Sequence, residues 1–234
     1  MKKVIVTTSW DDGHILDLKL AELLKKYKLR GTFYVSPRNR EFKAEELLSD
    51  EQIKQLGCDF EIGGHTMTHP LLGSVSLEKS KTEIENSKQY LEQLLGKPVL
   101  SFCYPSGDYN RFHMDQVRNA GFKLARTVKR YSLNIGDNPY ELLTTLHAYN
   151  HFSDAWKIAL FANFNPLKFI AYYRNWNLLA KAMFDRALKK GGVFHLWGHS
   201  WEIEKNNHWQ ALEDVLRHIS NNEGVQYIIN ADLL

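Results

Sequence analysis

The sequence predicts an α/β fold in which a mostly parallel sheet of about seven strands curls into a closed or nearly closed barrel. Short apolar segments that are typical of strands alternate with longer segments of helical periodicity along the whole chain. No repeat, low-complexity segment or linker interrupts the 234 residues. We therefore expect one domain that spans residues 1–234 and has a core large enough to fold alone.

The first half of the chain contains four strand patterns separated by helical ones. The strands are predicted at residues 4–9 (VIVTTS), 31–36 (GTFYVS), 60–64 (FEIGG) and 99–104 (VLSFCY). A first helix is predicted over residues 15–27 and a long one from Leu77 to about residue 96. Between them, Ser49 and Gln52 have capping-box spacing, which predicts a helix that ends at Gly57.

The second half continues the alternation with less regular segments. Strands are predicted at residues 122–127, 142–149, 191–197 and 225–229, and helices before Gly121, around 166–190 and around 209–219. The segment 161–176 (FANFNPLKFIAYYRNW) is rich in aromatic residues at helical spacing. We expect these side chains to lie in the core, the alternative being part of a groove that stacks against sugar rings.

Composition limits the classes of partner. The net charge of +3 is small and dispersed, so we expect no binding to nucleic acid. No segment is apolar enough to span a membrane, and the amino-terminal residues do not form a secretory signal. We therefore expect a cytoplasmic protein, the alternative being an export signal that was removed. Cys58 and Cys103 are too far apart in sequence to suggest a thiolate metal cluster.

Two adjacent carboxylates follow the first predicted strand, in the sequence WDDGH. Asp11 and Asp12 therefore lie at the carboxyl end of a parallel strand, where the sites of α/β folds form. Asp and Gly are also common in ordinary turns, so this pair requires partners elsewhere in the chain to indicate a site.

Two histidines follow the third predicted strand, in GGHTMTHP. The spacing of His65 and His69 places both imidazoles on one side of a helical turn, where they can reach a single metal ion. With Asp12 they form a set of two histidines and one carboxylate that leaves coordination positions open. Asp11 can then take a proton from the attacking water.

At this point the sequence resembles the polysaccharide deacetylases, also called carbohydrate esterase family 4. The resemblance rests on SWDDG (residues 9–13), HTMTH (65–69), FCYPSGDYN (102–110) and GGVFHLWGHSWE (191–202), with support from RGTFYVS and GFKLART. It implies a distorted (β/α) barrel and one divalent metal ion, most often zinc, held by Asp12, His65 and His69. It also implies hydrolysis of an N-acetyl or related acyl group.

The resemblance assigns further roles within this site. Asp11 would act as the base, the backbone N–H of Ser106 would stabilise the oxyanion, and a histidine would protonate the leaving amine. Alternation along the last long strand places His195 and His199 on one face. His199 is favoured as the acid because it lies at the carboxyl end, and His195 is the alternative. His147 and His151 are expected to contact loops or substrate, or else to hold a second metal ion.

The third motif departs from the family pattern. Many members have an arginine two residues before the proline, where it pairs with the catalytic aspartate, but this chain has Cys103 there. Arg126, on the next strand, can supply the charge, or it can be a structural arginine. Candidate substrate contacts are Tyr104, Pro105, Trp201, Glu202, His195 and Arg126.

Three functions remain open from the sequence. The leading one is a metal-dependent deacetylase that acts on an N-acetylated sugar or glycoconjugate. The second is an amide hydrolase that uses the same site on a non-sugar carbon–nitrogen bond. The third is a homologue without turnover that binds metal or glycan, which Cys103 at the arginine position suggests. The sequence does not define the oligomeric state.

Overall fold

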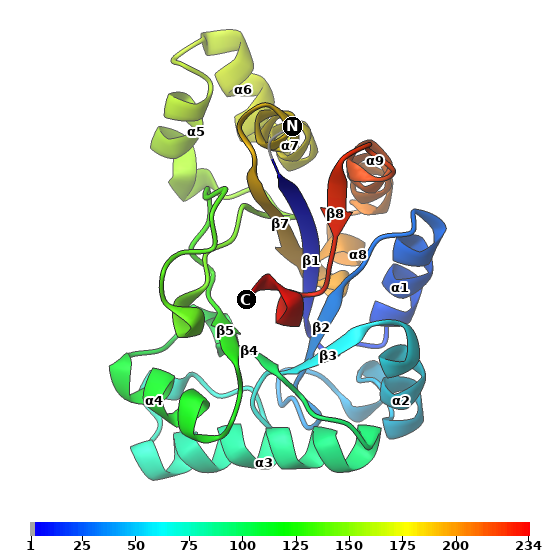
Figure 1. The fold of residues 1–234 in the computed structure, drawn as a ribbon, viewed down its shortest axis with the longest axis vertical. Coiled ribbons are helices and arrows are strands. Elements are labelled where there is room, and N and C mark those ends of the chain that lie inside the picture. Colours follow the sequence, from blue (N-terminus) through cyan, green and yellow to red (C-terminus); the bar gives the residue numbers. More distant parts are fainter. Residues whose placement is uncertain (1–2) are drawn as a thin grey trace.

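The computed structural model describes residues 3–234 as one curled sheet surrounded by helices (Figure 1). The sheet has eight strands in the order β5-β4-β3-β2-β1-β7-β6, with β8 paired to β1, and the ladders between them are parallel. The strands are β1 (Val4–Asp12), β2 (Thr32–Val35), β3 (Glu61–Gly64), β4 (Ser101–Cys103), β5 (Leu124–Arg126), β6 (Leu146–His147), β7 (Gly192–Gly198) and β8 (Val225–Tyr227). The predicted parallel β/α barrel is thus confirmed.

The barrel is nearly closed by the segment that precedes β6. β5 and β6 are the two outer strands of the sheet order. Leu142 forms a parallel bridge with Arg126 at the end of β5. Three residues later, Thr145 donates its N–H to the carbonyl of His195 on β7 over 3.0 Å. Residues 142–145 therefore connect the two sides of the sheet without forming a long strand.

Nine α-helices lie around the sheet in residues 3–234. They are α1 (Asp17–Lys26), α2 (Asp50–Asp59), α3 (Leu77–Leu95), α4 (Arg111–Asn119), α5 (Ala155–Phe161), α6 (Pro166–Arg174), α7 (Trp176–Lys190), α8 (Ser200–Lys205) and α9 (Trp209–Ile219). Along this part of the chain, no helix combines the length and apolarity that crossing a membrane requires. Most of the helices cover the sheet, whereas α5 and α6 extend beyond it at one end of the molecule (Figure 1).

Several helix ends agree with the sequence signals. Ser49 caps α2 as predicted: its hydroxyl accepts the N–H of Gln52 over 3.3 Å, and the Gln52 side chain accepts the N–H of Ser49 over 2.8 Å. Gly96 ends α3 with a left-handed φ of 65°. The last long helix has the predicted bounds, Trp209–Ile219.

Other predicted elements were wrong in extent. α2 does not end at Gly57 but continues to Asp59. Gly57 is a buried position within the helix, where a side chain would meet Leu95 of α3. The strand predicted over residues 142–149 is reduced to Leu146–His147. The single aromatic helix predicted around 166–190 is two helices that meet at Asn175, whose φ of −136° and ψ of 94° are extended. α8 was not predicted.

A polar cluster joins the carboxyl-terminal segment to the barrel interior. Asn230 is fully buried and accepts a hydrogen bond from the Thr7 hydroxyl (2.8 Å). Its amide donates to the Tyr34 hydroxyl (2.9 Å), and its backbone N–H donates to the Thr32 hydroxyl (3.0 Å). Because these partners lie on β1 and β2, Asn230 fixes the chain end against two strands.

Replacing Asn230 with Ala is therefore expected to lower the free energy of unfolding by about 2 kcal/mol, because the hydroxyls of Thr7 and Tyr34 stay buried and lose a partner. Urea denaturation followed by tryptophan fluorescence measures this change. Gln226→Ala, on the exposed side of β8, is the control and should cost less than about 0.5 kcal/mol. Equal stability of the two variants would contradict a role for the Asn230 cluster.

Candidate active site

A pocket of about 470 Å³ lies where the carboxyl ends of several strands meet. Its volume is within the range of small-molecule sites. Five predicted site residues with a carboxylate or an imidazole line it together with aromatic side chains: Asp11, Asp12, His65, His69 and His199. The lining residues are Asp11, Asp12, Glu41, His65, His69, Tyr104, Ser106, Val128, Arg130, His147, His151, Trp197, His199 and Trp201.

The last two residues of β1 place both carboxylates in this pocket. Asp11 and Asp12 are each 2% exposed. Asp12 has a φ of 86° and Gly13 a φ of 73°, so the backbone turns sharply directly after the strand. A positive φ is uncommon for a residue with a side chain and is often found at functional sites. This turn allows two consecutive side chains to face one pocket instead of opposite faces of the sheet.

Three side chains converge on one point beside Asp12. Its Oδ1 lies 3.5 Å from His65 Nε2 and 3.2 Å from His69 Nε2. The two Nε2 atoms lie 3.2 Å from each other. Ligands held about 2.0 to 2.1 Å from a tetrahedral zinc ion are about 3.3 Å apart. The triangle of donor atoms therefore has the dimensions of one face of such a site.

The other ring nitrogen of each histidine has its own partner. His65 Nδ1 lies 2.7 Å from the carbonyl oxygen of Cys103, and His69 Nδ1 lies 2.9 Å from Glu41 Oε1. Because these partners are hydrogen-bond acceptors, each Nδ1 carries the proton, and each Nε2 presents a lone pair. Asp12 Oδ1 is buried and has no hydrogen-bond partner among residues 3–234. The donor set thus fits a divalent cation.

The loop that carries the histidines is not the helical turn that their spacing predicts. Residues 65–69 are irregular, with φ values of 65° at Thr66 and 59° at His69. The buried side chain of Glu83 from α3 holds the loop by accepting the N–H groups of Met67 (3.1 Å) and Thr68 (2.8 Å). The two imidazoles therefore meet because of this loop, and the helical reason for their approach was wrong.

Asp11 forms a buried ion pair with Arg126. One guanidinium nitrogen, Nη2, donates to both carboxylate oxygens of Asp11. Arg126 is fully buried, and its guanidinium carbon lies 4.5 Å from the Trp197 ring centre and 5.3 Å from that of Tyr34. Burial alone would raise the pKa of Asp11, but the combined effect of Arg126, His65 and His199 outweighs it, so the pKa is lowered.

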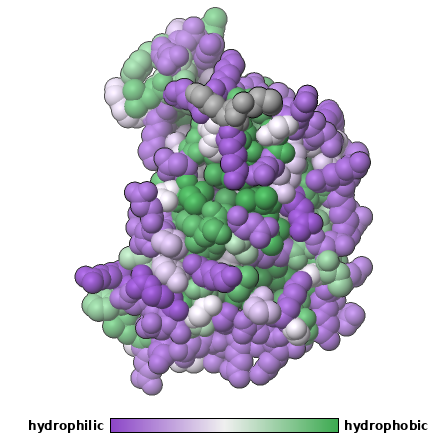
Figure 2. Space-filling model, viewed as in Figure 1, coloured by the Kyte–Doolittle hydropathy of each residue, from purple (hydrophilic) through white to green (hydrophobic). Residues whose placement is uncertain are grey.

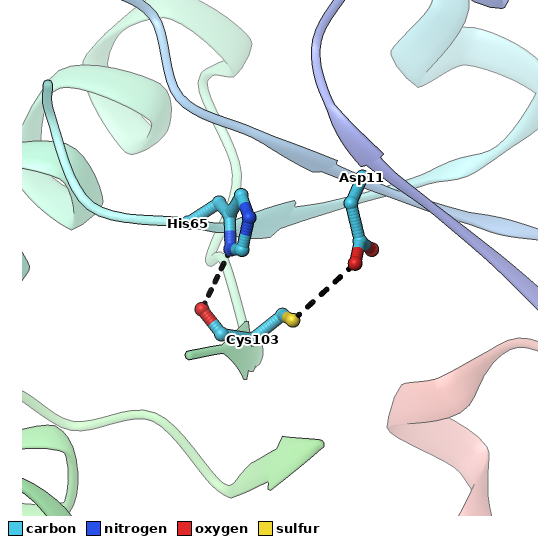
Figure 3. Close-up of side chains that lie close together, drawn as sticks. All are labelled: Asp11, His65 and Cys103. Atoms are coloured by element: carbon cyan, nitrogen blue, oxygen red, sulfur yellow. Dashed lines mark hydrogen bonds between the residues drawn. The ribbon is translucent and has the colours of Figure 1, made fainter. Parts of the chain in front are cut away.

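Cys103 contacts the same carboxylate from the neighbouring strand (Figure 3). Its thiol lies 3.7 Å from Asp11 Oδ2, and burial raises the pKa of the thiol well above its usual value, so it stays protonated. Cys103 and Arg126 are partners in the register of β4 and β5, which places both side chains on one side of the sheet. The guanidinium expected at position 103 therefore comes from the adjacent strand.

His199 faces both aspartates from the end of β7. Its Nε2 lies 4.0 Å from Asp11 Oδ2 and 4.0 Å from Asp12 Oδ2, and its Nδ1 lies 3.3 Å from Glu202 Oε2. Burial would lower the pKa of His199, but Asp12, Glu202 and Asp11 raise it to about 9. This set of carboxylates favours the protonated form of His199.

Glu202 connects His199 to a second histidine. Its Oε2 lies 3.0 Å from His147 Nε2, whose ring stacks on Trp197 with 3.9 Å between the ring centres. Burial lowers the pKa of His147 to about 4, so His147 is neutral. Its Nδ1 lies 2.7 Å from His151 Nε2. Burial would raise the pKa of Glu202, but its contacts with His147 and His199 lower this pKa to about 2.

A sequence profile described as polysaccharide deacetylase matches residues 1–125, which is more than half of the chain. The chain belongs to the polysaccharide deacetylase family. It is 27% identical over 121 residues to the peptidoglycan-N-acetylglucosamine deacetylase of Bacillus cereus, an alignment that covers 51% of this chain and 54% of that protein. The chain spans about half, or less, of the length of the curated relatives that it matches.

Solved structures of polysaccharide deacetylases have the same fold. The Streptococcus pyogenes deacetylase PplD, in complex with acetate, is 26% identical, with a TM-score of 0.54 over 58% of this chain and 62% of that chain. The chitin deacetylase from the fungal pathogen Colletotrichum lindemuthianum superposes with a TM-score of 0.63 at 16% identity. This second comparison covers 100% of this chain and 88% of that chain, so the fold extends over the described residues.

In this member of the polysaccharide deacetylase family, most of the predicted site residues line the pocket, and four do not. Tyr104, Ser106 and Trp201 line the pocket, and Trp201 Nε1 donates to Asp12 Oδ2 over 2.7 Å. Four predicted substrate contacts lie outside the lining: Pro105, Glu202, His195 and Arg126.

Two of these positions have a clear physical reason. Arg126 lies behind Asp11 with its charge already paired. His195 lies deeper in the barrel, where it is 2.8 Å from the Ser9 hydroxyl, and burial lowers its pKa to about 3. His195 is thus an interior residue of β7, in agreement with the preference for His199 at the carboxyl end of that strand.

Two supporting residues were missed by the sequence analysis. Glu41 bonds to His69 but lies in an irregular segment with no pattern that points to the site. Glu83 lies on the inward side of α3, one residue before the fully buried Ile84. A glutamate on the inward side of a helix indicates that a hydrogen-bond partner lies opposite it, because burying an unpaired carboxylate costs free energy.

Substituting Arg126 with Met should lower the free energy of unfolding by about 3 to 5 kcal/mol, because Asp11 is then buried without its counter-charge. Urea denaturation measures the loss. Arg118→Met breaks the exposed Arg118–Asp115 pair and should cost at most about 1 kcal/mol. The double variant Asp11→Asn/Arg126→Met should be more stable than Arg126→Met alone. A single variant as stable as wild type would refute the importance of the pair.

Proposed function

We propose that this protein is a metal-dependent hydrolase that removes an N-acetyl or related acyl group from an amino sugar or glycoconjugate. The observation that carries the proposal is the convergence of Asp12 Oδ1, His65 Nε2 and His69 Nε2 within 3.2 to 3.5 Å of one another. An ionised carboxylate and a protonated histidine face this same point. Membership in the polysaccharide deacetylase family supports the reaction class.

Asp12, His65 and His69 would hold one divalent metal ion, and we propose zinc. Two imidazoles and one carboxylate are a ligand set that zinc accepts. When bound, the ion would polarise the acyl carbonyl and make water more acidic. Glu41 and the Cys103 carbonyl would keep both imidazoles in the tautomer that ligation requires.

Asp11 is proposed as the general base. Arg126 keeps its carboxylate ionised, so Asp11 can accept a proton from water that enters the pocket. Ser106 lies on the pocket wall with a φ of 52°, in a turn closed by hydrogen bonds from Gly107 N–H to Tyr104 O and from Asp108 N–H to Pro105 O. We propose that the Ser106 N–H stabilises the developing oxyanion.

His199 is proposed as the general acid that protonates the leaving amine. Its Nε2 faces Asp11 and Asp12 at 4.0 Å, and its pKa of about 9 keeps it protonated at neutral pH. Glu202 fixes the orientation of the ring through Nδ1 at 3.3 Å. The base and the acid thus have opposite charge states at the same pH, as the two proton transfers require.

The position of the Arg126 guanidinium affects one of the two alternative functions, the homologue without turnover. A homologue without turnover was suggested only by Cys103 at the arginine position, and Arg126 removes that reason. An amide hydrolase that acts on a non-sugar carbon–nitrogen bond would use the same base, acid and metal ligands. It therefore differs in substrate alone.

Metal content and acetate release from a panel of N-acetylated sugars test the proposal. Wild type should contain one metal ion per chain, and Asp11→Asn should keep the metal and lose about 10²- to 10⁴-fold in rate. Asp115→Asn, on the exposed side of α4, is the matched control and should retain the rate. Metal without acetate release would favour another amide substrate, and a chain that takes up no zinc would refute the site.

The dependence of the rate on pH tests the role of Glu202. His199 acts in its protonated form, so the rate should fall as the pH rises through its pKa. Since Glu202 is one of the groups that raise this pKa, Glu202→Gln should move the alkaline decline to lower pH. Glu204→Gln, two residues later on the exposed side of α8, should leave the profile unchanged. An unaltered profile in Glu202→Gln would contradict the assignment.

A further inference from the structure

Helices α5 and α6 carry apolar side chains on the outside of the molecule. Trp156 is 68% exposed, Phe164 60% and Leu167 78%. The aromatic side chains of α6 are half-buried and pack against the core, as predicted, whereas its aliphatic Leu167 and Ile170 face outward and Phe164, just before the helix, is exposed. We define the apolar face as Phe152, Trp156, Leu160, Phe164, Leu167 and Ile170. Figure 2 shows hydrophobic and hydrophilic residues side by side on this projecting part.

Ring contacts connect the apolar face at α5 with the residues in and beside α6. Trp156 and Leu160 are four residues apart on one side of α5, and Phe152 lies in the short 3-10 helix that precedes it. The Trp156 and Phe164 ring centres lie 5.6 Å apart, and Phe152 contacts Tyr173 of α6 at 5.3 Å. Exposed apolar residues that are gathered in this way usually mark an interaction surface.

Positive charge is concentrated in the same segment. Residues 155–190 contain seven of the chain's 30 lysines and arginines but only one of its 27 acidic residues, Asp185. The segment therefore has a net charge of +6, whereas the whole chain has +3 and the remainder is negative. Asp185 itself lies 2.7 Å from His218 Nε2 on α9.

Part of this charge lines a cleft next to the apolar face. Lys157, Arg186 and Lys190 surround a cleft of about 410 Å³ whose apolar lining includes Leu160 and Phe161. Leu160 also belongs to the apolar face, so the cationic and the apolar surfaces adjoin. The cleft can take an anionic group while the neighbouring apolar side chains contact hydrocarbon.

We propose that α5, α6 and this cleft dock onto a membrane surface that contains anionic phospholipids. Aromatic and aliphatic side chains beside lysine and arginine are typical of elements that lie in the membrane interface. Each cation near an anionic bilayer contributes about 1 kcal/mol. The charge distribution argues against a second copy of the chain, because two such faces would each present the positive charges of Lys157, Lys168, Arg186 and Lys190. The docking stands independently of the proposed reaction.

Sedimentation with phospholipid vesicles tests the docking. Wild type should bind vesicles of phosphatidylcholine with 30% phosphatidylglycerol at least tenfold more strongly than pure phosphatidylcholine, because about 1 kcal/mol is gained per engaged cation. Leu167→Glu should lose at least tenfold in binding to the anionic vesicles. Phe112→Glu, which changes an exposed side chain on α4 in the same way, should bind as wild type does.

Charge reversal provides the second arm. Lys168→Glu on α6 should weaken binding to the anionic vesicles about 10- to 30-fold, because it changes the local charge by two. Lys54→Glu, at an exposed position of α2, should have little effect. Thermal unfolding of each variant verifies the fold without reference to activity.

Three outcomes would overturn the proposal. They are equal binding of wild type to neutral and anionic vesicles, equal binding of wild type and Leu167→Glu, and competition by free glycerol phosphate that abolishes sedimentation. A dimer in light scattering that dissociates in Leu167→Glu, without vesicle binding by wild type, would assign the apolar face to a second copy instead.

Discussion

Two adjacent carboxylates buried at the end of β1 impose the main constraint on this molecule. A buried anion is tolerated only when cations or hydrogen-bond donors surround it, and Asp11 and Asp12 need separate sets. Asp11 is compensated by Arg126 of β5. Asp12 Oδ2 accepts the indole N–H of Trp201, and its Oδ1 faces His65 and His69, where the proposed metal ion would supply the positive charge. Since these groups come from distant strands, the site exists only when the sheet is curled.

The same constraint explains how the two proposed proton-transfer groups acquire opposite charge states. A guanidinium on one side keeps Asp11 anionic, and three carboxylates around His199 keep its imidazole cationic. Glu202 and the neutral, stacked His147 support the imidazole from the far side. The fold thus determines the charge of each group, because it places the group at a strand end beside its charged partners.

The sequence predicted the part of this arrangement that depends on local patterns. The alternation of strand-like and helical segments predicted the parallel barrel. The spacing of His65 and His69, and the place of Asp12 after the first strand, predicted a metal site. The 65–69 loop could not be predicted, because its conformation depends on Glu83, a residue of a later helix. Likewise α6 has a helical pattern of apolar residues, but periodicity alone does not tell whether an apolar stripe faces a core or the outside.

The pairing of Cys103 with Arg126 in the register of β4 and β5 has a consequence for how such chains are classified. Either of two neighbouring parallel strands can supply the charge that pairs with one carboxylate, because register partners share a side of the sheet. A search for an arginine at one motif position would therefore class this chain as defective. Whether a member of such a family is inactive should be judged from whether a cation lies beside the aspartate, whichever strand carries that cation.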